Sequence, residues 1–250
     1  MRTKGSKTTM QVDLILQGKG GVGKSVIASL LAQHYRGRDI VPVCVDTDPV
    51  NATFAGYQAF GVERLDIMEG EDINPRQFDV LVERIMKGGE AATTMVVDNG
   101  AASFVPLCSY LASNEVIPFL SEAGHFVRLH TVLTGGQALD DTFKGLTSLA
   151  DSFPDTPIVV WFNEFFGPLE RNGVNLEKSA QYKNLAKRIT AQFTLPAVKK
   201  ETFGHDLEQM LSARQTFDEA VASDAYSIMA RQRLKMYWRK VSAQMDRGQL

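Results

Sequence analysis

The chain has 250 residues, of which 44% are apolar and 22% are charged. This is the composition of an ordinary globular protein that is long enough to bury a substantial core. A formal net charge of −2 gives no overall reason to expect a nucleic-acid-binding protein. The sequence has no apolar run of about 18 residues, which excludes a transmembrane helix.

Two further features indicate where the protein works. Residues 1–9 are polar and basic and lack the apolar stretch of a signal peptide. Cys44 and Cys108 have no metal-binding or redox spacing, which fits a reducing compartment. We therefore expect a cytoplasmic protein, with a flexible tail over residues 1–10 and one domain over residues 11–250.

Short apolar runs alternate with longer amphipathic segments along the chain. This alternation predicts an α/β protein with three layers, a mostly parallel sheet covered by helices on both faces. The strands are expected at residues 11–17, 40–45, 93–97, 115–120, 157–162 and 193–198.

Cap residues mark two of the predicted helices. Gly37 is a natural C-cap for a helix over residues 26–36. Asn74 and Pro75 have the pattern of an N-cap and a first-turn proline, and Gly88-Gly89 would end that helix. The C-terminal helices are expected at residues 206–213 and 217–244.

The first predicted strand is followed by G-x-x-x-x-G-K-[ST], the phosphate-binding P-loop. Its glycines lack a Cβ and tolerate positive φ, so backbone N–H groups can surround a phosphate. Lys24 supplies positive charge to the β- and γ-phosphates, and the Ser25 hydroxyl is a ligand for Mg²⁺. The expected nucleotide contacts are Gly18, Gly20, Gly21, Val22, Gly23, Lys24, Ser25 and Val26.

Two predicted strands end in an aspartate. Asp46 follows the strand at 40–45, and Asp98 follows the strand at 93–97. The carboxyl ends of parallel strands meet at one edge of a sheet, where ligands bind, so both side chains should lie near the P-loop. Mg²⁺ takes oxygen ligands, and Asp98 in particular has the place of a Walker B aspartate that holds the ion.

The segment around Asn163 indicates which base is bound. Guanine-specific P-loop proteins resemble N-K-x-D at such a strand end, where the aspartate accepts from guanine. This chain has Glu164 in place of the lysine and Phe166 in place of the aspartate. Guanine would leave donors unpaired, which is costly, whereas the Asn163 amide can serve adenine. The sequence therefore predicts ATP.

These motifs together resemble the ParA/MinD group of ATPases, which has a second lysine in a P-loop of the form K-G-G-V-G-K-S. The resemblance implies that Lys19 reaches the partner's phosphates in an ATP-sandwich homodimer. It also implies that the D-x-D-P stretch supplies Asp46 to the magnesium shell and Asp48 to position the attacking water. A slow, Mg²⁺-dependent ATPase that acts as a switch is expected, with Lys19, Lys24 and Asp48 as its catalytic residues.

Three segments, at 17–25, 46–54 and 159–164, look like the TraL-type ATPases encoded in plasmid conjugal-transfer regions. That resemblance implies an accessory ATPase with a protein partner in the transfer or segregation machinery. Two alternatives stay open: a ParA-like plasmid-partition ATPase that binds non-specific DNA, and a non-hydrolysing adaptor that uses nucleotide to set its dimeric state.

A basic segment near the C-terminus leaves its own role open. Its cations interleave with apolar residues at helical spacing, as in a helix that packs one face and solvates the other. Contact with DNA and a weak membrane-surface helix are the alternatives. The cations are Arg231, Arg233, Lys235, Arg239 and Lys240.

Overall fold

The computed structural model describes residues 9–88, 93–171 and 173–250, so the predicted tail at residues 1–8 and the end of a helix at Gly89 lie outside the described residues. The main-sheet strands are β1 (Gln11–Ile15), β2 (Val43–Asp46), β3 (Glu63–Arg64), β6 (Thr94–Asp98), β7 (Phe126–Thr134), β8 (Ile158–Asn163) and β11 (Ile189–Leu195). Two small hairpins pair β4 (Met68–Glu69) with β5 (Asp72–Ile73) and β9 (Glu170–Arg171) with β10 (Val174–Asn175).

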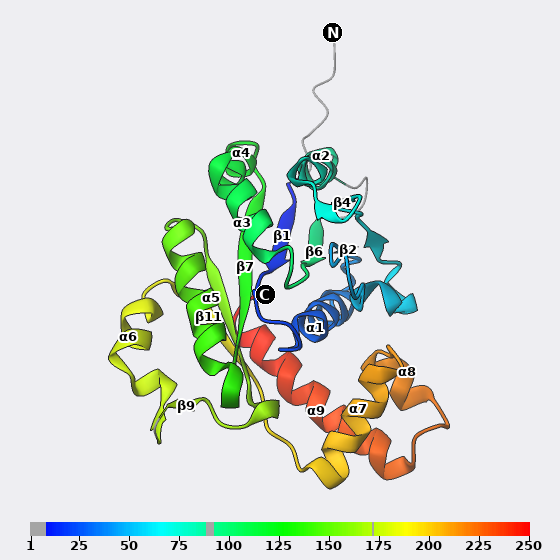
Figure 1. Ribbon diagram of the computed structural model, residues 1–250. Helices are drawn as coiled ribbons and strands as arrows, with labels where there is room; N and C mark the ends of the chain where they lie inside the picture. Colours follow the sequence, from blue (N-terminus) through cyan, green and yellow to red (C-terminus); the bar gives the residue numbers. More distant parts are fainter. Residues whose placement is uncertain (1–8, 89–92, 172) are drawn as a thin grey trace.

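The main sheet is parallel throughout these residues, in the order β11-β8-β7-β1-β6-β2-β3 (Figure 1). The helices are α1 (Lys24–Arg36), α2 (Phe78–Lys87), α3 (Phe104–Ser113), α4 (Val116–Glu122), α5 (Leu139–Ser152), α6 (Ala180–Ala186), α7 (His205–Ser212), α8 (Phe217–Ala222) and α9 (Ile228–Arg247). Among the described residues, no helix is both long and apolar enough to span a membrane.

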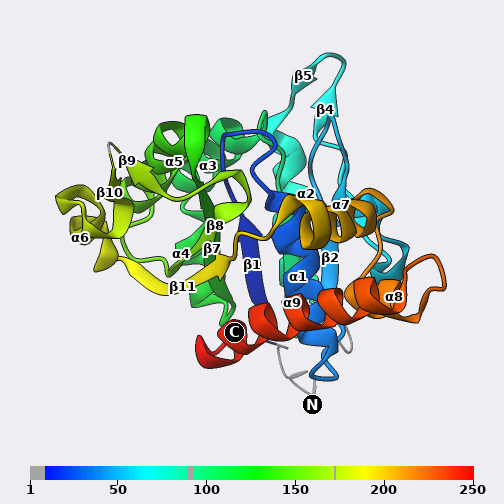
Figure 2. The ribbon, with the colours of Figure 1, turned by 90° about the horizontal axis from the view of Figure 1, so that it is seen from below.

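Helices cover the sheet on both faces, as the sequence predicts. The core on one face takes buried side chains from α2, α3, α4 and α5, and the core on the other takes them from α1, α7, α8 and α9. Figure 2 shows α3 and α5 on the far side of the sheet from α9. Every residue of β6 and β8 is buried, because a parallel strand covered on both faces has no solvent side.

The predicted strand at 115–120 is wrong. These residues form most of α4, with Val116, Ile117 and Leu120 buried and Phe119 exposed. That spacing fits one face of a helix as well as an apolar strand, and short apolar runs do not distinguish the two. Pro118 is tolerated because it lies in the first turn.

The sequence pattern did not predict the short strands β3, β4, β5, β9 and β10 or the long strand β7, which lies in the middle of the sheet between β1 and β8. Arg128 and His130 interrupt its apolar pattern, yet both side chains are buried. They reach Asp13 on β1: Arg128 Nε donates to Asp13 Oδ1 at 2.8 Å, and His130 Nε2 lies 3.1 Å from the same oxygen. The polar residues of β7 therefore belong to the interior.

The buried cluster around Asp13 extends to neighbouring elements. Tyr35 on α1 donates to Asp13 Oδ2 at 2.5 Å, and Arg128 donates to the Tyr35 hydroxyl at 2.8 Å. Trp161 Nε1 on β8 lies 3.0 Å from His130 Nδ1. The pKa of Asp13 is held well below its usual value: burial raises it, but the hydrogen bond and charge of His130 and the charge of Arg128 outweigh that. The cluster ties β1, β7, β8 and α1 together.

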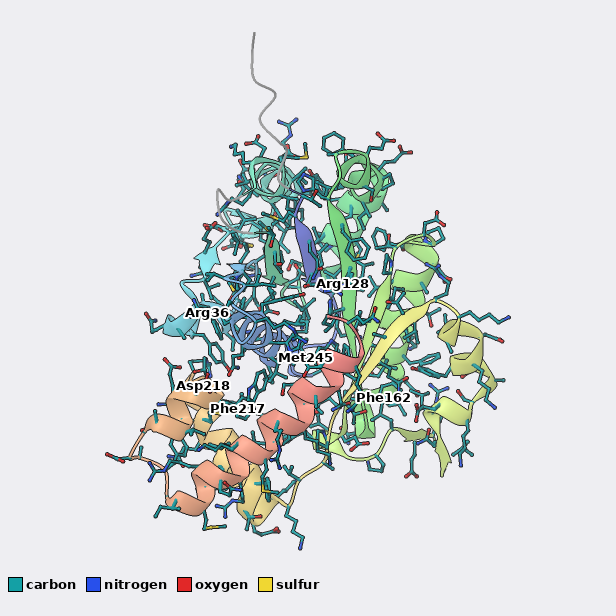
Figure 3. All side chains as sticks on the ribbon, turned by 180° about the vertical axis from the view of Figure 1, so that it is seen from behind. Arg36, Arg128, Phe162, Phe217, Asp218 and Met245 are labelled. Atoms are coloured by element: carbon teal, nitrogen blue, oxygen red, sulfur yellow. The ribbon has the colours of Figure 1, made fainter. Side chains whose placement is uncertain are left out.

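The C-terminal helix also differs from its prediction. Residues 217–244 are not continuous, because α8 ends at Ala222 and α9 begins after Ser227, whose side chain accepts from the Ala230 N–H at 3.2 Å. Such local side-chain caps favour a helix start. The two helices then pack together: the Phe217 ring stacks on Trp238 with 5.3 Å between centroids. Figure 3 shows α9 crossing the face of the molecule that it shares with α1, α7 and α8, with Phe217 beside it and Met245 near its C-terminal end.

The other boundaries shift by a few residues. The last strand, predicted at 193–198, runs from Ile189 to Leu195 and stops before Pro196. Met10 is fully buried and its carbonyl accepts from the Phe126 N–H at 2.9 Å, so the ordered chain includes this residue of the predicted tail. Gly37 is the C-cap of α1, and Asn74 accepts from Arg76 N, both as expected.

One contact fixes the P-loop strand against α5. Gln17 Nε2 donates to the carbonyls of Val132 and Thr142 at 2.9 and 3.0 Å. Gly145 of α5 lies against the same amide, and a Cβ on that glycine would come within 2.2 Å of Gln17 Oε1. A side chain at position 145 would therefore displace the Gln17 amide from its present position.

Candidate functional site

The P-loop leaves β1 and enters α1 through two glycines in the left-handed region. Gly21 has φ 72° and Gly23 has φ 103°, backbone conformations that residues with a Cβ rarely adopt. Gly23 is the N-cap of α1, and no side chain caps its first N–H groups. These donors, with the positive end of the helix dipole, form a site suited to phosphate.

Lys24 begins α1 and is only 8% exposed. Its Nζ donates to the Lys19 carbonyl at 3.1 Å, across the loop. Burial lowers the pKa of Lys24, and the charges of Asp98 and Asp48 oppose that effect. The P-loop cation thus lies in the loop beside two carboxylates, with a backbone oxygen as its partner.

The predicted strand-end acids do meet at the edge of the sheet. Asp98 is the register partner of Asp46 on β2 and of Ile15 on β1, directly before the P-loop. Asp98 is 1% exposed, and its Oδ1 has no hydrogen-bond partner in the described part of the chain. Burial raises the pKa of Asp98 to about 7, although a hydrogen bond from the Ser25 hydroxyl lowers it.

Asp98 is therefore a buried acid that a cation would stabilise. An isolated buried carboxylate is costly, and it favours the neutral form unless a positive charge is near. Lys24 lowers the pKa of Asp98, but the nearby charges of Asp46 and Asp48 raise it. Among the described residues no group of three His, Cys, Asp or Glu side chains is arranged to hold a metal. A magnesium ion at Asp98 would need Ser25, water and the phosphates of a nucleotide to complete its shell.

Asp46 has a different set of contacts. Its Oδ1 accepts from the Asp48 N–H and its Oδ2 from the Ala55 N–H, both at 2.9 Å. Burial raises the pKa of Asp46, and these backbone hydrogen bonds lower it. In this conformation Asp46 holds the loop between β2 and residue 55 in place, and its place in the magnesium shell remains a prediction.

Asp48 lies at the mouth of the site. Its Oδ1 accepts from the Val50 and Asn51 N–H groups at 2.9 and 3.0 Å. The side chain packs against Gly100 after β6, where an added Cβ would lie 2.8 Å from Asp48 Cγ. The two loops that follow β2 and β6 are therefore in direct contact, and any shift of one moves Asp48.

A cavity of about 460 Å³ opens between the P-loop and these two loops. The volume is in the range of ordinary small-ligand sites. The cavity brings together part of the predicted phosphate-binding loop, Asp48 and the segment that follows Asp98. Its lining includes Gly20, Gly21, Lys24, Ser25, Asp48 and Ala101.

Lys19 points to a different neighbour. Its Nζ forms an ion pair with Asp141 Oδ2 at 2.9 Å, in the first turn of α5. Both side chains are about half exposed, at 44% and 50%. Lys19 is thus held at the surface, and its predicted role across a dimer requires that this ion pair be exchanged for a partner's phosphate.

Asn163 ends β8 and is tied to the protein at both ends of its amide. Nδ2 donates to the Val22 carbonyl at 2.9 Å, and Oδ1 accepts from the Phe165 N–H at 3.1 Å. Asn163 also lies against Gly23, whose added Cβ would be 3.0 Å from Nδ2. The residue joins the P-loop to β8, with Val26 and Phe165 lining the same small cavity of about 110 Å³. Its reading of adenine remains a prediction.

The fold and this site define the class of protein. The structure of a MinC:MinD cell division protein complex from Aquifex aeolicus matches with a TM-score of 0.56 at 13% identity, covering 93% of this chain and 96% of that one. MinD from Aquifex aeolicus matches with a TM-score of 0.50, also at 13% identity, covering 93% and 97%. The chain has the fold of the MinD/ParA P-loop NTPases.

Comparison of sequences is more specific. No family model matches the chain. Two Escherichia coli proteins named Protein TraL are 49% and 48% identical to it over 237 residues, covering 94% of this chain and 97% of each relative. The chain belongs to the TraL family.

Proposed function

We propose that this protein is a Mg²⁺-dependent ATPase that acts as a molecular switch in plasmid conjugal transfer. The observation that carries the proposal is the meeting of a P-loop, a buried lysine and a buried aspartate at one sheet edge, where Asp98 Oδ1 has no partner among the described residues. Phosphoryl transfer requires mainly positioning and charge neutralisation. Lys24 and the first N–H groups of α1 bind the β- and γ-phosphates, while Ser25 and Asp98 hold Mg²⁺.

Hydrolysis then depends on Asp48 and on a second subunit. Asp48 lies at the cavity and orients the attacking water, and Asp46 belongs to the shell around the magnesium. Lys19 leaves Asp141 and neutralises charge on the partner's nucleotide, so that ATP joins two subunits in a dimer. A ligand that binds the dimer better than the monomer shifts the population toward the dimer. Hydrolysis removes the γ-phosphate and releases the subunits.

The biological setting follows from the family. This chain resembles the TraL-type ATPases of conjugal-transfer regions, and its relatives carry the name TraL, which supports a cytoplasmic accessory ATPase with a protein partner in that machinery. A partition ATPase that binds DNA is the second candidate, favoured by the exposed Lys235, Arg239 and Lys240 on α9. Against it, Arg231 and Arg233 already pair with Asp224 and Asp206. A non-hydrolysing adaptor is the third.

The test is calorimetry of Mg²⁺-ATP and Mg²⁺-GTP binding with three variants. Lys24→Ala should lose ATP binding while its circular dichroism is unchanged, and Lys183→Ala, which removes an exposed lysine of α6, should bind as the parent does. GTP should bind at least about tenfold more weakly than ATP, or 1.4 kcal/mol. Asp48→Ala should bind ATP without releasing phosphate.

Each outcome bears on one part of the proposal. Equal ATP affinity in the parent and in Lys24→Ala would refute the site. Equal affinity for GTP and ATP would refute the role of Asn163. A parent protein that binds ATP but never releases phosphate would support the adaptor.

A further inference from the structure

An open groove of about 330 Å³ lies between α9 and the segment that leads from β11 to α7, and it shares no lining residue with the P-loop cavity. Figure 1 shows the ribbons of α9 and of this segment. The lining of the groove is mostly apolar and is bordered by lysines on both sides. The residues that matter here are Val198, Lys199, Phe203, Met236, Tyr237 and Lys240.

The groove is preformed by contacts within the chain. Arg233 on α9 donates to both carboxylate oxygens of Asp206, with Nε 2.5 Å from Oδ2. The same guanidinium lies over the Phe203 ring, 6.0 Å from its centroid. The ion pair therefore holds one wall of the groove against α9, and little ordering is needed when a ligand enters.

The charge around the groove is unbalanced. Lys199, Lys200, Lys235, Arg239 and Lys240 are exposed, and within residues 9–88, 93–171 and 173–250 none of them forms an ion pair. The acids nearby are fewer. Glu201 is exposed in the same segment, and Glu164 accepts from the Ala197 N–H at 3.1 Å. The border is thus positive around an apolar floor on which Met236 is 43% exposed.

We propose that this groove is the docking site for an acidic amphipathic segment of a protein partner. Leucine or phenylalanine side chains of such a segment would enter the groove over Val198, Phe203 and Met236. Its carboxylates would meet Lys199 on one side and Lys240 on the other. This is helix-in-groove recognition, in which apolar anchors provide affinity and flanking charges provide orientation.

The same features disfavour other anionic partners. A DNA backbone needs a row of cations that follows the phosphates, whereas here the lysine borders are separated by an apolar floor. A membrane-surface helix needs a continuous apolar face outward. The exposed apolar residues of α9 are Ile228, Met229 and Met236, and the exposed Gln232 and Lys235 lie between the first two and Met236.

The groove is also connected to the nucleotide site, and this part rests on the proposed function. Tyr237 lines both the groove and the small cavity that contains Asn163 and Val26. Ala197 at the groove is hydrogen-bonded to Glu164, the residue that follows Asn163. The two sites therefore share contacts, and any coupling carried through them must be reciprocal, so that each ligand changes the affinity of the other by the same factor.

The experiment uses fluorescence anisotropy of labelled helical peptides with the full-length protein. The peptides carry leucine or phenylalanine at i, i+3, i+4 and i+7, with glutamate on the flanks; control peptides carry lysine instead of glutamate, or a scrambled order. Binding should weaken with salt and fall at least about tenfold, or 1.4 kcal/mol, in Lys199→Glu with Lys240→Glu. Met236→Glu should weaken it without any change in the cationic border.

The matched control is Lys183→Glu with Lys187→Glu, which reverses two exposed lysines at α6 and should leave peptide binding unchanged. The docking proposal is overturned if no acidic peptide binds, if the groove and control variants behave alike, or if duplex DNA or anionic phosphatidylserine vesicles bind through these residues while the peptides do not. ATP affinity is measured by calorimetry on the same samples. Loss of ATP binding alone would refute the proposed function, and intact ATP binding without peptide binding would refute only the groove.

Discussion

Asp13 and Asp98 lie on adjacent strands of one sheet, and both are buried, at 0% and 1% exposure. Asp13 has Arg128, His130 and Tyr35 as partners, and its pKa is depressed. Asp98 has an oxygen with no partner in the described chain, and its pKa is raised to about 7. The first carboxylate is compensated by the protein itself, and the second is suited to an external cation. Burial of an acid alone does not separate a structural from a functional residue; its partners do.

The largest expected effect on stability comes from removing Asp13 from its buried cluster with Arg128, His130 and Tyr35. Asp13→Ala leaves Arg128 buried and unpaired, which should lower the free energy of unfolding by about 3–5 kcal/mol. Urea denaturation followed by circular dichroism measures it. Asp98→Ala is the matched control on the next strand and should cost much less, since no buried cation depends on it alone. Equal losses in the two variants would contradict the comparison.

A smaller effect should appear in the pH dependence of stability. The pKa of Asp98 is about 7 in the folded protein against an ordinary value of 3.8, so between these values the folded state binds more protons than the unfolded state. Stability from this group is therefore complete below about pH 4 and is lost as the pH rises to about 7. Asp98→Asn lacks the titrating group. Over that pH range its free energy of unfolding should rise relative to that of the parent by at most about 4 kcal/mol, at 1.4 kcal/mol per pKa unit.

Urea denaturation at several pH values gives the measurement. Asp13→Asn provides the opposite case: its depressed pKa contributes stability that is present above the unfolded pKa and is lost as the pH falls below it. Mg²⁺ with ATP should reduce the fall caused by Asp98, because the ion favours the charged carboxylate. If the free energy of unfolding of the parent and of Asp98→Asn changes with pH in parallel, Asp98 is not the titrating group.

The smallest effect on stability is expected at a third carboxylate, Asp141, whose ion pair with Lys19 is exposed. Exposed pairs contribute little, so Asp141→Asn should leave the urea midpoint unchanged. It should nevertheless free Lys19 and increase the dimer fraction with Mg²⁺-ATP, measured by light scattering. Asp151→Asn, at another exposed acid of α5, is the control, and Lys19→Ala should stay monomeric. An unchanged monomer–dimer balance in Asp141→Asn would refute the proposal that Lys19 exchanges Asp141 for the nucleotide of the other subunit.

The sequence predicted the parts of the site that depend on local patterns. The P-loop, the acids after β2 and β6, and the Asn74 cap each need a few adjacent residues, and the fold brings the first two together as expected. The sequence could not show that Asp13 on β1 compensates Arg128 and His130 on β7, because those partners are over 100 residues apart. Without that pairing, nothing local to residues 126–134 explains polar side chains in the middle of a sheet, and the apolar run of α4 predicts a strand as well as a helix.

The contact between Gln17 and Gly145 couples two positions that lie far apart in the sequence. Glycine inside a helix costs about 1 kcal/mol of stability relative to alanine. Alanine would therefore normally be the more stable residue at position 145 of α5. Here an alanine Cβ would meet Gln17 Oε1 at 2.2 Å and disturb the amide that joins β7 and α5 directly before the P-loop. A Cβ at position 145 therefore requires the Gln17 amide to move away from its hydrogen bonds to Val132 and Thr142, so these two distant positions are physically coupled.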